Sequence, residues 1–147
     1  PLSPRGGSSA ASDGFKGQLE GVEPVVVGFG FEQSPRNPKR AWWTTFLGVE
    51  TPVYFGAEQW AHKYDAAVVY GAVRRTGRGR YKVEFRLVEE HVKGLNKGHV
   101  MDRCLGELEE EVLQAPSDWL WSHKRWKHKR PDGVEVQQRM FERTLES

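Results

Sequence analysis

The 147-residue sequence predicts an α/β fold in which a mixed β-sheet is flanked by helices, and three patterns support this class. Residues 24–31 form a short run of β-branched and aromatic side chains. Apolar and charged residues alternate from Tyr81 to Leu87, and apolar residues recur at helical spacing from His99 to Leu113. A chain of this length suits one domain, which can bury about two thirds of the surface of the unfolded chain.

A Ser- and Gly-rich stretch opens the chain and contains one basic residue, Arg5. Its glycines permit close approach of the backbone to an anion, whereas a flexible chain end explains the same composition. Ser12 or Asp13 is a suitable N-cap for a short helix, which Gly21 would end. The sequence therefore predicts a helix that leads into the run at residues 24–31.

The run at residues 24–31 is followed by a charged loop. The run is too short for a helix and is typical of a buried parallel strand. Two X-Pro steps, Ser34-Pro35 and Asn37-Pro38, then prevent a helix or a strand from continuing. In open α/β sheets ligands bind beyond the carboxyl ends of strands, so the loop is a candidate binding site; a solvated surface loop is the alternative. The candidate residues are Glu32, Gln33, Arg36, Lys39 and Arg40.

An aromatic ledge follows at residues 41–49, where Trp42, Trp43 and Phe46 come directly after these cations. Aromatic and basic groups together suit a lipid headgroup or a membrane surface. Packing of the rings into the core explains the pattern equally well.

Helical spacing of apolar residues predicts the next element, a helix from Gly56 to Tyr64. Its apolar face is expected to pack, while Glu58 and Lys63 face water. His62 borders the apolar face, and we assign it a structural role.

Two strands and a longer helix follow. Residues 67–73 predict a second buried strand, residues 76–79 a turn, and residues 81–87 a strand with one face in water, so we expect an antiparallel hairpin at the edge of the sheet. The helix at residues 99–113 carries a Met and Cys stripe, which belongs to the core far more often than to a cofactor site. Four glutamates, at positions 107 and 109–111, lie opposite that stripe.

A basic segment with interleaved aromatic residues comes near the end of the chain. Of the eight residues at 123–130, seven are basic or histidine and the eighth is Trp126; Trp119 and Trp121 come just before them. This pattern suits rings at the level of lipid headgroups and cations on phosphates. A nucleic-acid patch would look similar, but the net charge of the whole chain is only +2, which argues against nucleic acid.

Composition excludes several other classes. The single cysteine, Cys104, excludes an internal disulfide and a metal site built of cysteines, and a reducing compartment is the simpler interpretation. The sequence contains no apolar run approaching about 18 residues and no signal peptide. Ser34 and Ser122 lack the context of a nucleophile elbow, so a complete hydrolase is poorly supported.

Several stretches, taken in order, resemble the late lipid A acyltransferases and the related lysophospholipid acyltransferases. They are Arg5-Gly6-Gly7-Ser8, Glu32-Gln33-Ser34-Pro35-Arg36-Asn37-Pro38, Trp43-Thr44-Thr45-Phe46-Leu47-Gly48 leading into Thr51-Pro52 and the helix at Gly56, and Ala115-Pro116 with Trp119 to Lys127. They cover about residues 5–131 at plausible spacing, which is more specific than any one motif.

The resemblance implies that residues 1–131 are the C-terminal part of an acyltransferase domain, with a partial mixed sheet flanked by helices, and that residues 132–147 are a polar tail. Such an enzyme moves a fatty acyl chain from an acyl-carrier-protein or coenzyme A thioester to a hydroxyl of a lipid acceptor, a lipid A precursor or a lysophospholipid. Its expected location is the cytoplasmic face of a bacterial inner membrane. No cofactor, metal or nucleic-acid partner is implied.

The resemblance also assigns expected roles to individual residues. Arg5, Glu32 and Gln33 would bind the acceptor or hold the reacting groups, and Arg36, Lys39 and Arg40 would be available for phosphates. The basic segment would line the site or rest on the membrane. Its expected contact residues are Trp121, His123, Lys124, Arg125, Trp126 and Lys127.

The chain departs from the family at the catalytic signature, a histidine followed five positions later by an acidic residue, in which the histidine deprotonates the acceptor hydroxyl. The residues five positions after the five histidines are Ala67, Asn96, Cys104, His128 and Gly133. We therefore expect the catalytic pair to lie before Pro1 in a longer enzyme, and the chain alone to be inactive. The alternative is a non-catalytic module that binds an anionic lipid surface or RNA.

Overall fold

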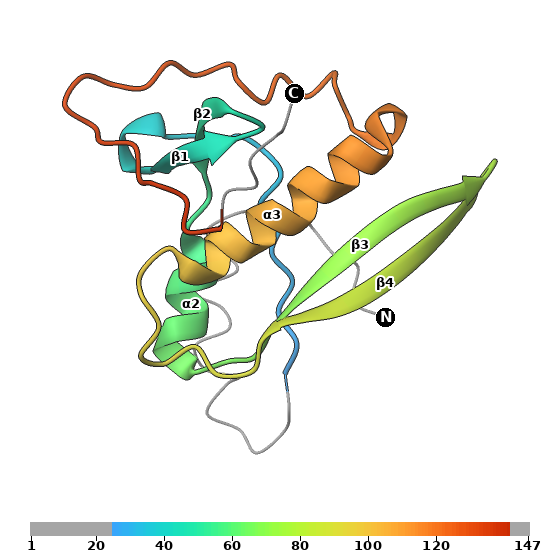
Figure 1. Cartoon of the computed structure of the whole chain (residues 1–147), viewed down its shortest axis with the longest axis horizontal. Helices are drawn as coiled ribbons and strands as arrows, with labels where there is room; N and C mark the ends of the chain where they lie inside the picture. The colour runs from blue at the N-terminus through green and yellow to red at the C-terminus, as the bar shows by residue number, and fades with distance from the viewer. Residues whose placement is uncertain (1–24, 142–147) are drawn as a thin grey trace.

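A computed structural model of the chain describes residues 25–141 and confirms the α/β class (Figure 1). Its regular elements are two antiparallel hairpins and two α-helices, with one short 3-10 helix before the first hairpin and another after the last α-helix. In chain order the elements are η1 (Pro38–Arg40), β1 (Trp42–Phe46), β2 (Val49–Val53), α2 (Gly56–Tyr64), β3 (Val68–Gly77), β4 (Arg80–Glu89), α3 (His99–Gln114) and η2 (Pro116–Asp118).

A tight turn fixes the register of the first hairpin. In the first, Trp42 pairs with Val53 and Phe46 with Val49, and the two turn residues, Leu47 and Gly48, both have positive φ. Positive φ at both positions is the requirement of the tight turns whose twist matches the flanking strands. The second hairpin pairs β3 with β4 and is the longer of the two. Within residues 25–141 these hairpins are two separate sheets.

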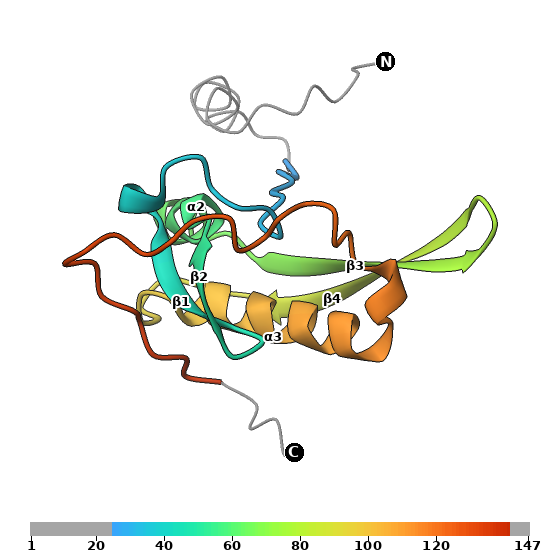
Figure 2. The ribbon, with the colours of Figure 1, turned by 90° about the horizontal axis from the view of Figure 1, so that it is seen from above.

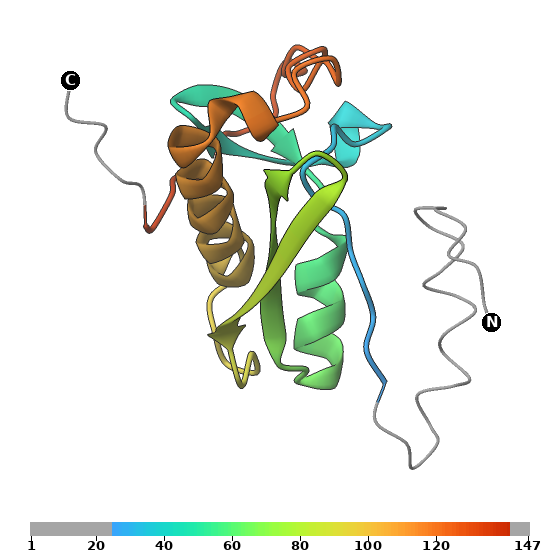
Figure 3. The same cartoon turned by 90° about the vertical axis from the view of Figure 1, so that its right-hand side faces the viewer.

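Helix α3 organises the core. It runs alongside the β3–β4 hairpin and contacts α2 (Figures 1 and 3). The apolar stripe predicted for it is buried, except that Leu113 faces solvent. Met101 and Cys104 are core residues, as expected from their spacing. The buried apolar side chains are Trp43, Phe46, Val53, Ala61, Tyr70, Ala72, Val88, Val92, Val100, Met101, Cys104, Leu105, Leu108 and Val112.

The buried parallel strand predicted at residues 24–31 is wrong for the residues that the structure describes. Residues 25–31 have no ladder partner, and Val26 is 96% exposed. Phe29 and Phe31 instead lie beside aromatic rings of α2 and β3, with ring centroids 6.2 Å from those of Trp60 and Tyr70. β-branched residues favour an extended backbone, but a strand also needs a neighbouring edge with which to exchange hydrogen bonds.

The β3–β4 hairpin forms as predicted, but the face expected to meet water packs on α3 and the face expected to be buried is exposed. The alternating apolar residues of β4, from Tyr81 to Leu87, are exposed, and Phe85 is 74% exposed, whereas Val88 near the end of the strand is buried. The polar face lies over the helix, where Tyr70 donates to Glu111 and Arg86 pairs with Glu107. β3 is accordingly buried on one face only, not on both. Alternation defines two faces of a strand but does not say which face meets a helix.

Two further expectations are settled by packing. Trp43 is buried and its Nε1 donates to the carbonyl oxygen of Pro38 at 2.8 Å, so the aromatic ledge packs into the core. Glu58, expected to face water, is fully buried. It precedes Ala61 by three residues and therefore lies on the same side of α2 as that core residue.

Part of the segment after residue 131 packs against the rest of the described structure. We call residues 134–141 the C-terminal strap; it lies along β1 and the N-terminal half of α3 (Figure 2). The backbone N–H of Gln137 donates to the carbonyl oxygen of Trp43 at 2.7 Å, and the hydroxyl of Thr44 donates to the carbonyl oxygen of Gln137 at 2.9 Å. The predicted N-terminal helix, with Arg5 before it, lies outside the described residues.

Candidate functional site

Two regions that are far apart in the sequence meet at one side of the molecule. We call them the Glu32 loop (residues 32–36) and the Trp–Lys segment (residues 119–127). Ser34 joins them, because its backbone N–H donates to Nε2 of His123 at 3.2 Å and its hydroxyl donates to the carbonyl oxygen of Arg125. The structure thus places two of the predicted groups of site residues side by side.

Arg125 is the centre of this junction. The residue is only 3% exposed, and its Nη1 donates to the carbonyl oxygen of Pro52 at 2.9 Å and to the hydroxyl of Ser34 at 3.4 Å. Within residues 25–141, its Nε and Nη2 have no hydrogen-bond partner. Burial lowers the pKa of Arg125 to about 10, and the negative charge of Glu32 opposes this lowering. The guanidinium therefore remains a cation at neutral pH.

The aromatic residues of the Trp–Lys segment attach it to the first hairpin. Nε1 of Trp126 donates to the hydroxyl of Thr51 at 2.8 Å, and its ring lies 6.2 Å from that of Phe46. The ring of Trp119 is 5.9 Å from the same phenylalanine. Trp121 differs, since it is 56% exposed while its Nε1 donates to the carbonyl oxygen of Pro116 at 2.7 Å. Two indoles thus anchor the segment and the third is available at the surface.

A pocket of about 330 Å³ opens on the same segment, and we call it the Trp pocket. Lys124 and Lys127 are exposed, whereas Arg125 forms part of the buried wall. Three indoles and three cations in one concavity can accept an anionic group that carries a planar or apolar neighbour. The lining residues are Trp119, Trp121, Lys124, Arg125, Trp126 and Lys127.

The remaining candidates, in the Glu32 loop and on η1, have side chains in contact with solvent. Gln33 and Arg36 are exposed, as are Lys39 and Arg40 on η1. Asn37 fixes the start of η1 by accepting a hydrogen bond from the backbone N–H of Lys39 at 3.0 Å. These side chains are positioned to meet a ligand from solvent, and their roles stay predictions.

Sequence reasoning missed the residues that join the two regions. Sequence patterns give no indication that Ser34, Thr51 and the carbonyl group of Pro52 form contacts with the Trp–Lys segment. No local pattern could have indicated a contact between residues about 90 positions apart. The one available signal was the presence of Arg125 among aromatic residues, because a cation in such surroundings needs hydrogen-bond acceptors.

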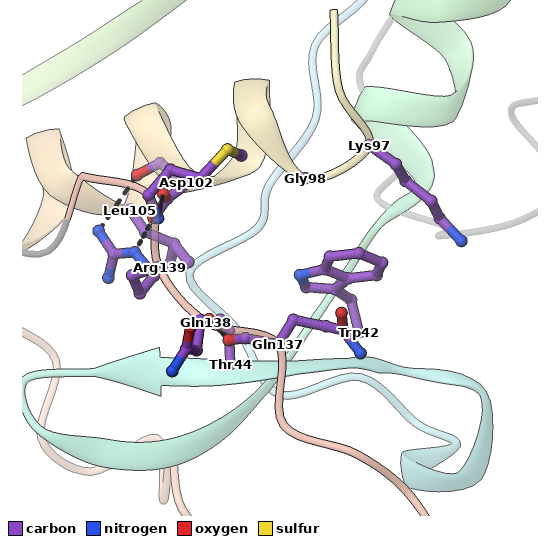
Figure 4. A pocket seen from close by; sticks show the side chains of 10 residues that line it. Trp42, Thr44, Lys97, Gly98, Asp102, Leu105, Gln137, Gln138 and Arg139 are labelled. Carbon is purple, nitrogen blue, oxygen red and sulfur yellow. Dashed lines mark hydrogen bonds and ion pairs between the residues drawn. The ribbon is translucent and has the colours of Figure 1, made fainter.

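A second pocket, of about 130 Å³, lies between α3, β1 and the C-terminal strap (Figure 4). The two buried charged groups of its lining, Asp102 and Arg139, are paired with each other and with the backbone. The Asp102 carboxylate pairs with Arg139 and accepts from the backbone N–H of Phe141 at 2.9 Å, and Nη1 of Arg139 donates to the carbonyl oxygen of Thr45 at 2.9 Å. We interpret this pocket as the fastening of the strap and not as a ligand site.

Among the residues that the structure describes, other titratable groups do not assemble into a catalytic site beside the Trp pocket. The imidazole of His99 lies 2.8 Å from the Glu89 carboxylate, but this pair sits at the start of α3 and Glu89 also pairs with Arg103. Burial raises the pKa of the Cys104 thiol to about 12, helped by the nearby charge of Glu58, so the thiol is neutral at physiological pH.

Residues 25–141 contain neither a metal-binding cluster nor a helix that could span a membrane. No group of three or more His, Cys, Asp or Glu side chains in this range is arranged to hold a metal ion. No helix in the same range is long and apolar enough to cross a membrane.

Comparison with known proteins supports one family. No curated protein and no solved structure matched the chain. A family model described as bacterial lipid A biosynthesis acyltransferase matches residues 25–128, well over half of the chain. The match includes the Glu32 loop, both hairpins, α3 and the Trp–Lys segment, so it agrees with the resemblance seen in the sequence motifs. The chain belongs to the bacterial lipid A biosynthesis acyltransferase family.

Proposed function

We propose that this chain is part of an enzyme that moves a fatty acyl chain from an acyl-carrier-protein or coenzyme A thioester to a hydroxyl of a lipid acceptor. The acceptor is a lipid A precursor or a lysophospholipid, and the reaction takes place at the cytoplasmic face of a bacterial inner membrane. The family match over residues 25–128 carries the proposal. The meeting of the Glu32 loop with the Trp–Lys segment supports it, since both belong to the matched region.

The chain's own contribution is acceptor binding, and the catalytic pair comes from elsewhere in the protein. The chain has no histidine followed five positions later by an acidic residue. A general base must reach the hydroxyl that it deprotonates, so a base outside this sequence would have to approach the Glu32 loop. On this proposal the 147-residue chain alone has no transferase activity.

Within the site, the residues divide by charge. Glu32 and Gln33 offer oxygen atoms that can hold an acceptor hydroxyl, and Arg5 contributes by resemblance. The exposed cations Arg36, Lys39 and Arg40 are suited to phosphate groups. Trp121, Lys124 and Lys127 present an amphipathic surface that can rest on anionic lipid. His123 and Arg125 hold this surface against the Glu32 loop, and Trp126 holds it against the first hairpin.

A transfer assay tests the proposal. The Glu32→Gln variant of the full-length protein that contains this chain is expected to lose at least about tenfold in kcat/KM, because it loses an anionic hydrogen-bond acceptor at the reacting hydroxyl. The matched control is Glu90→Gln, which changes an exposed carboxylate just after β4. Equal activity of wild type and Glu32→Gln would remove Glu32 from the site, and absence of transfer by the full-length protein would overturn the function.

A non-catalytic module is the second candidate, favoured by the exposed Trp121 beside two exposed lysines. Such a module would bind anionic vesicles or RNA in a salt-sensitive manner, and its full-length protein would transfer no acyl chain. Vesicle binding measured alongside the transfer assay separates the two functions.

A further inference from the structure

Arg125 lines the Trp pocket, and two of its buried donor nitrogens have no partner in the described part of the chain. Its Nη1 donates to the carbonyl oxygen of Pro52. Nε and Nη2 have no hydrogen-bond partner within residues 25–141, although only 3% of the residue is exposed. A buried donor left without an acceptor costs about 1–3 kcal/mol, and more when it is charged. The arrangement is therefore more favourable when another molecule supplies acceptor oxygens.

The surroundings define the chemistry of that molecule. Lys124 and Lys127 add two exposed cations at the same pocket. In the described part of the chain, Glu32 is the acidic residue whose charge acts on Arg125, and no hydrogen bond joins the two side chains. The net local charge is therefore positive. Three indoles complete the lining, and they suit a planar or apolar group next to an anion.

We propose that the Trp pocket binds a phosphate group, with the guanidinium of Arg125 as the central donor, Lys124 and Lys127 at the rim, and the indoles against the molecule that carries the phosphate. The planar guanidinium matches the geometry of phosphate oxygens, which an ammonium group does not. This inference deepens the proposed function and rests on it for one point only, namely that the phosphate belongs to the lipid acceptor.

The test is a binding titration of the 147-residue chain, followed by the fluorescence of its tryptophans. One arm uses inorganic phosphate, and the other uses phosphatidylcholine vesicles with and without phosphatidic acid. Arg125→Lys keeps the charge but loses the planar fork, and we expect it to weaken phosphate binding about tenfold. The variant Lys124→Ala/Lys127→Ala changes two exposed side chains, and we expect it to weaken binding at least about threefold.

Lys129→Ala is the matched control, because Lys129 is an exposed cation of the same basic run that does not line the pocket. It should bind phosphate within about twofold of wild type. Circular dichroism shows whether Arg125→Lys folds; should it fail to fold, the double lysine variant alone decides the outcome.

Each result supports or overturns the site. Binding in both arms upholds it and identifies a lipid phosphate, whereas binding of inorganic phosphate alone upholds it and identifies a soluble ligand. Vesicle binding without phosphate binding, reduced as much by Lys129→Ala as by the double lysine variant, would show a diffuse basic surface and overturn it. Unchanged phosphate binding by both pocket variants would also overturn it. Neither arm measures acyl transfer. The phosphate site can therefore be upheld even if the proposed transferase function fails, and the transferase function can be upheld even if the phosphate site fails.

Discussion

The buried carboxylate of Glu58 on α2 accepts a hydrogen bond from the backbone N–H of Met101 on α3 at 2.8 Å. Its other oxygen accepts from the backbone N–H of Gly98, the residue that precedes α3. The first turn of a helix has N–H groups without partners inside the helix, and a negative charge there is favourable. A side chain of one helix thus caps the other and fixes the angle between them.

Removal of this cap should destabilise the whole fold. Glu58→Ala leaves two buried N–H groups unpaired, and we expect it to lower the free energy of unfolding by about 2–4 kcal/mol. Glu58→Gln keeps one acceptor oxygen and should lose less. Urea denaturation followed by circular dichroism measures both, with the exposed neighbour Gln59→Ala as control. A loss for Glu58→Ala no greater than that of the control would show that the cap contributes nothing.

The C-terminal strap should detach when its arginine is changed. The side chain of Arg139 is 1% exposed and pairs with Asp102 and Glu109, so Arg139→Met leaves two largely buried carboxylates without their cation. Breaking a buried ion pair in this way costs about 3–5 kcal/mol. We expect faster cleavage of residues 134–141 in limited proteolysis, followed by mass spectrometry. Gln138→Ala, at an exposed neighbouring position, should be cut at the wild-type rate; equal rates for both variants would contradict the fastening.

Stability should fall at alkaline pH through the buried thiol of Cys104. Burial raises its pKa from an ordinary value near 9 to about 12, so the native state holds the proton more tightly than the unfolded chain. The resulting stabilisation is fully present below about pH 9 and is lost as the pH rises toward 12, with a limiting slope of about 1.4 kcal/mol per pH unit. Denaturation curves at several pH values should therefore show a steeper alkaline loss in wild type than in Cys104→Ala. Identical pH profiles would contradict the raised pKa.

The exposed apolar face of the β3–β4 hairpin should govern self-association more than stability. Phe85 is 74% exposed, and an uncovered apolar sheet face favours contact with other molecules. We expect Phe85→Thr to change the free energy of unfolding by less than about 0.5 kcal/mol and to reduce association in light scattering. Val88→Thr, on the buried face of the same strand, should cost at least about 1 kcal/mol. The assignment of faces would be wrong if Phe85→Thr proved the more destabilising change.

Local patterns predicted the elements better than their environments. The bounds of α2 and the buried stripe of α3 follow from helical spacing, and the β3–β4 hairpin follows from alternation around a turn. The buried position of Glu58 and the exposed position of Phe85 did not follow, since each depends on which other element packs against that face. The run at residues 25–31 has strand composition but lacks a strand partner in the described structure.

In the candidate site, too, the parts were predictable from the sequence but their contact was not. Composition identified the Glu32 loop and the Trp–Lys segment separately, because charged and aromatic residues are conspicuous in sequence. Their contact through Ser34, and the burial of Arg125, are tertiary properties that join residues about 90 positions apart. They could not be predicted from either stretch alone.

On the proposed function, the Glu32 loop and the Trp–Lys segment form one acceptor site, and a double-mutant cycle in acyl transfer tests this most directly. The kcat/KM of the full-length protein is measured for Glu32→Gln, Arg125→Lys and the double variant. For one site, the double variant should depart by more than about twofold from the product of the two single losses, because residues that share a site are energetically coupled. Losses that multiply within that margin, or no loss in any variant, would contradict a shared site.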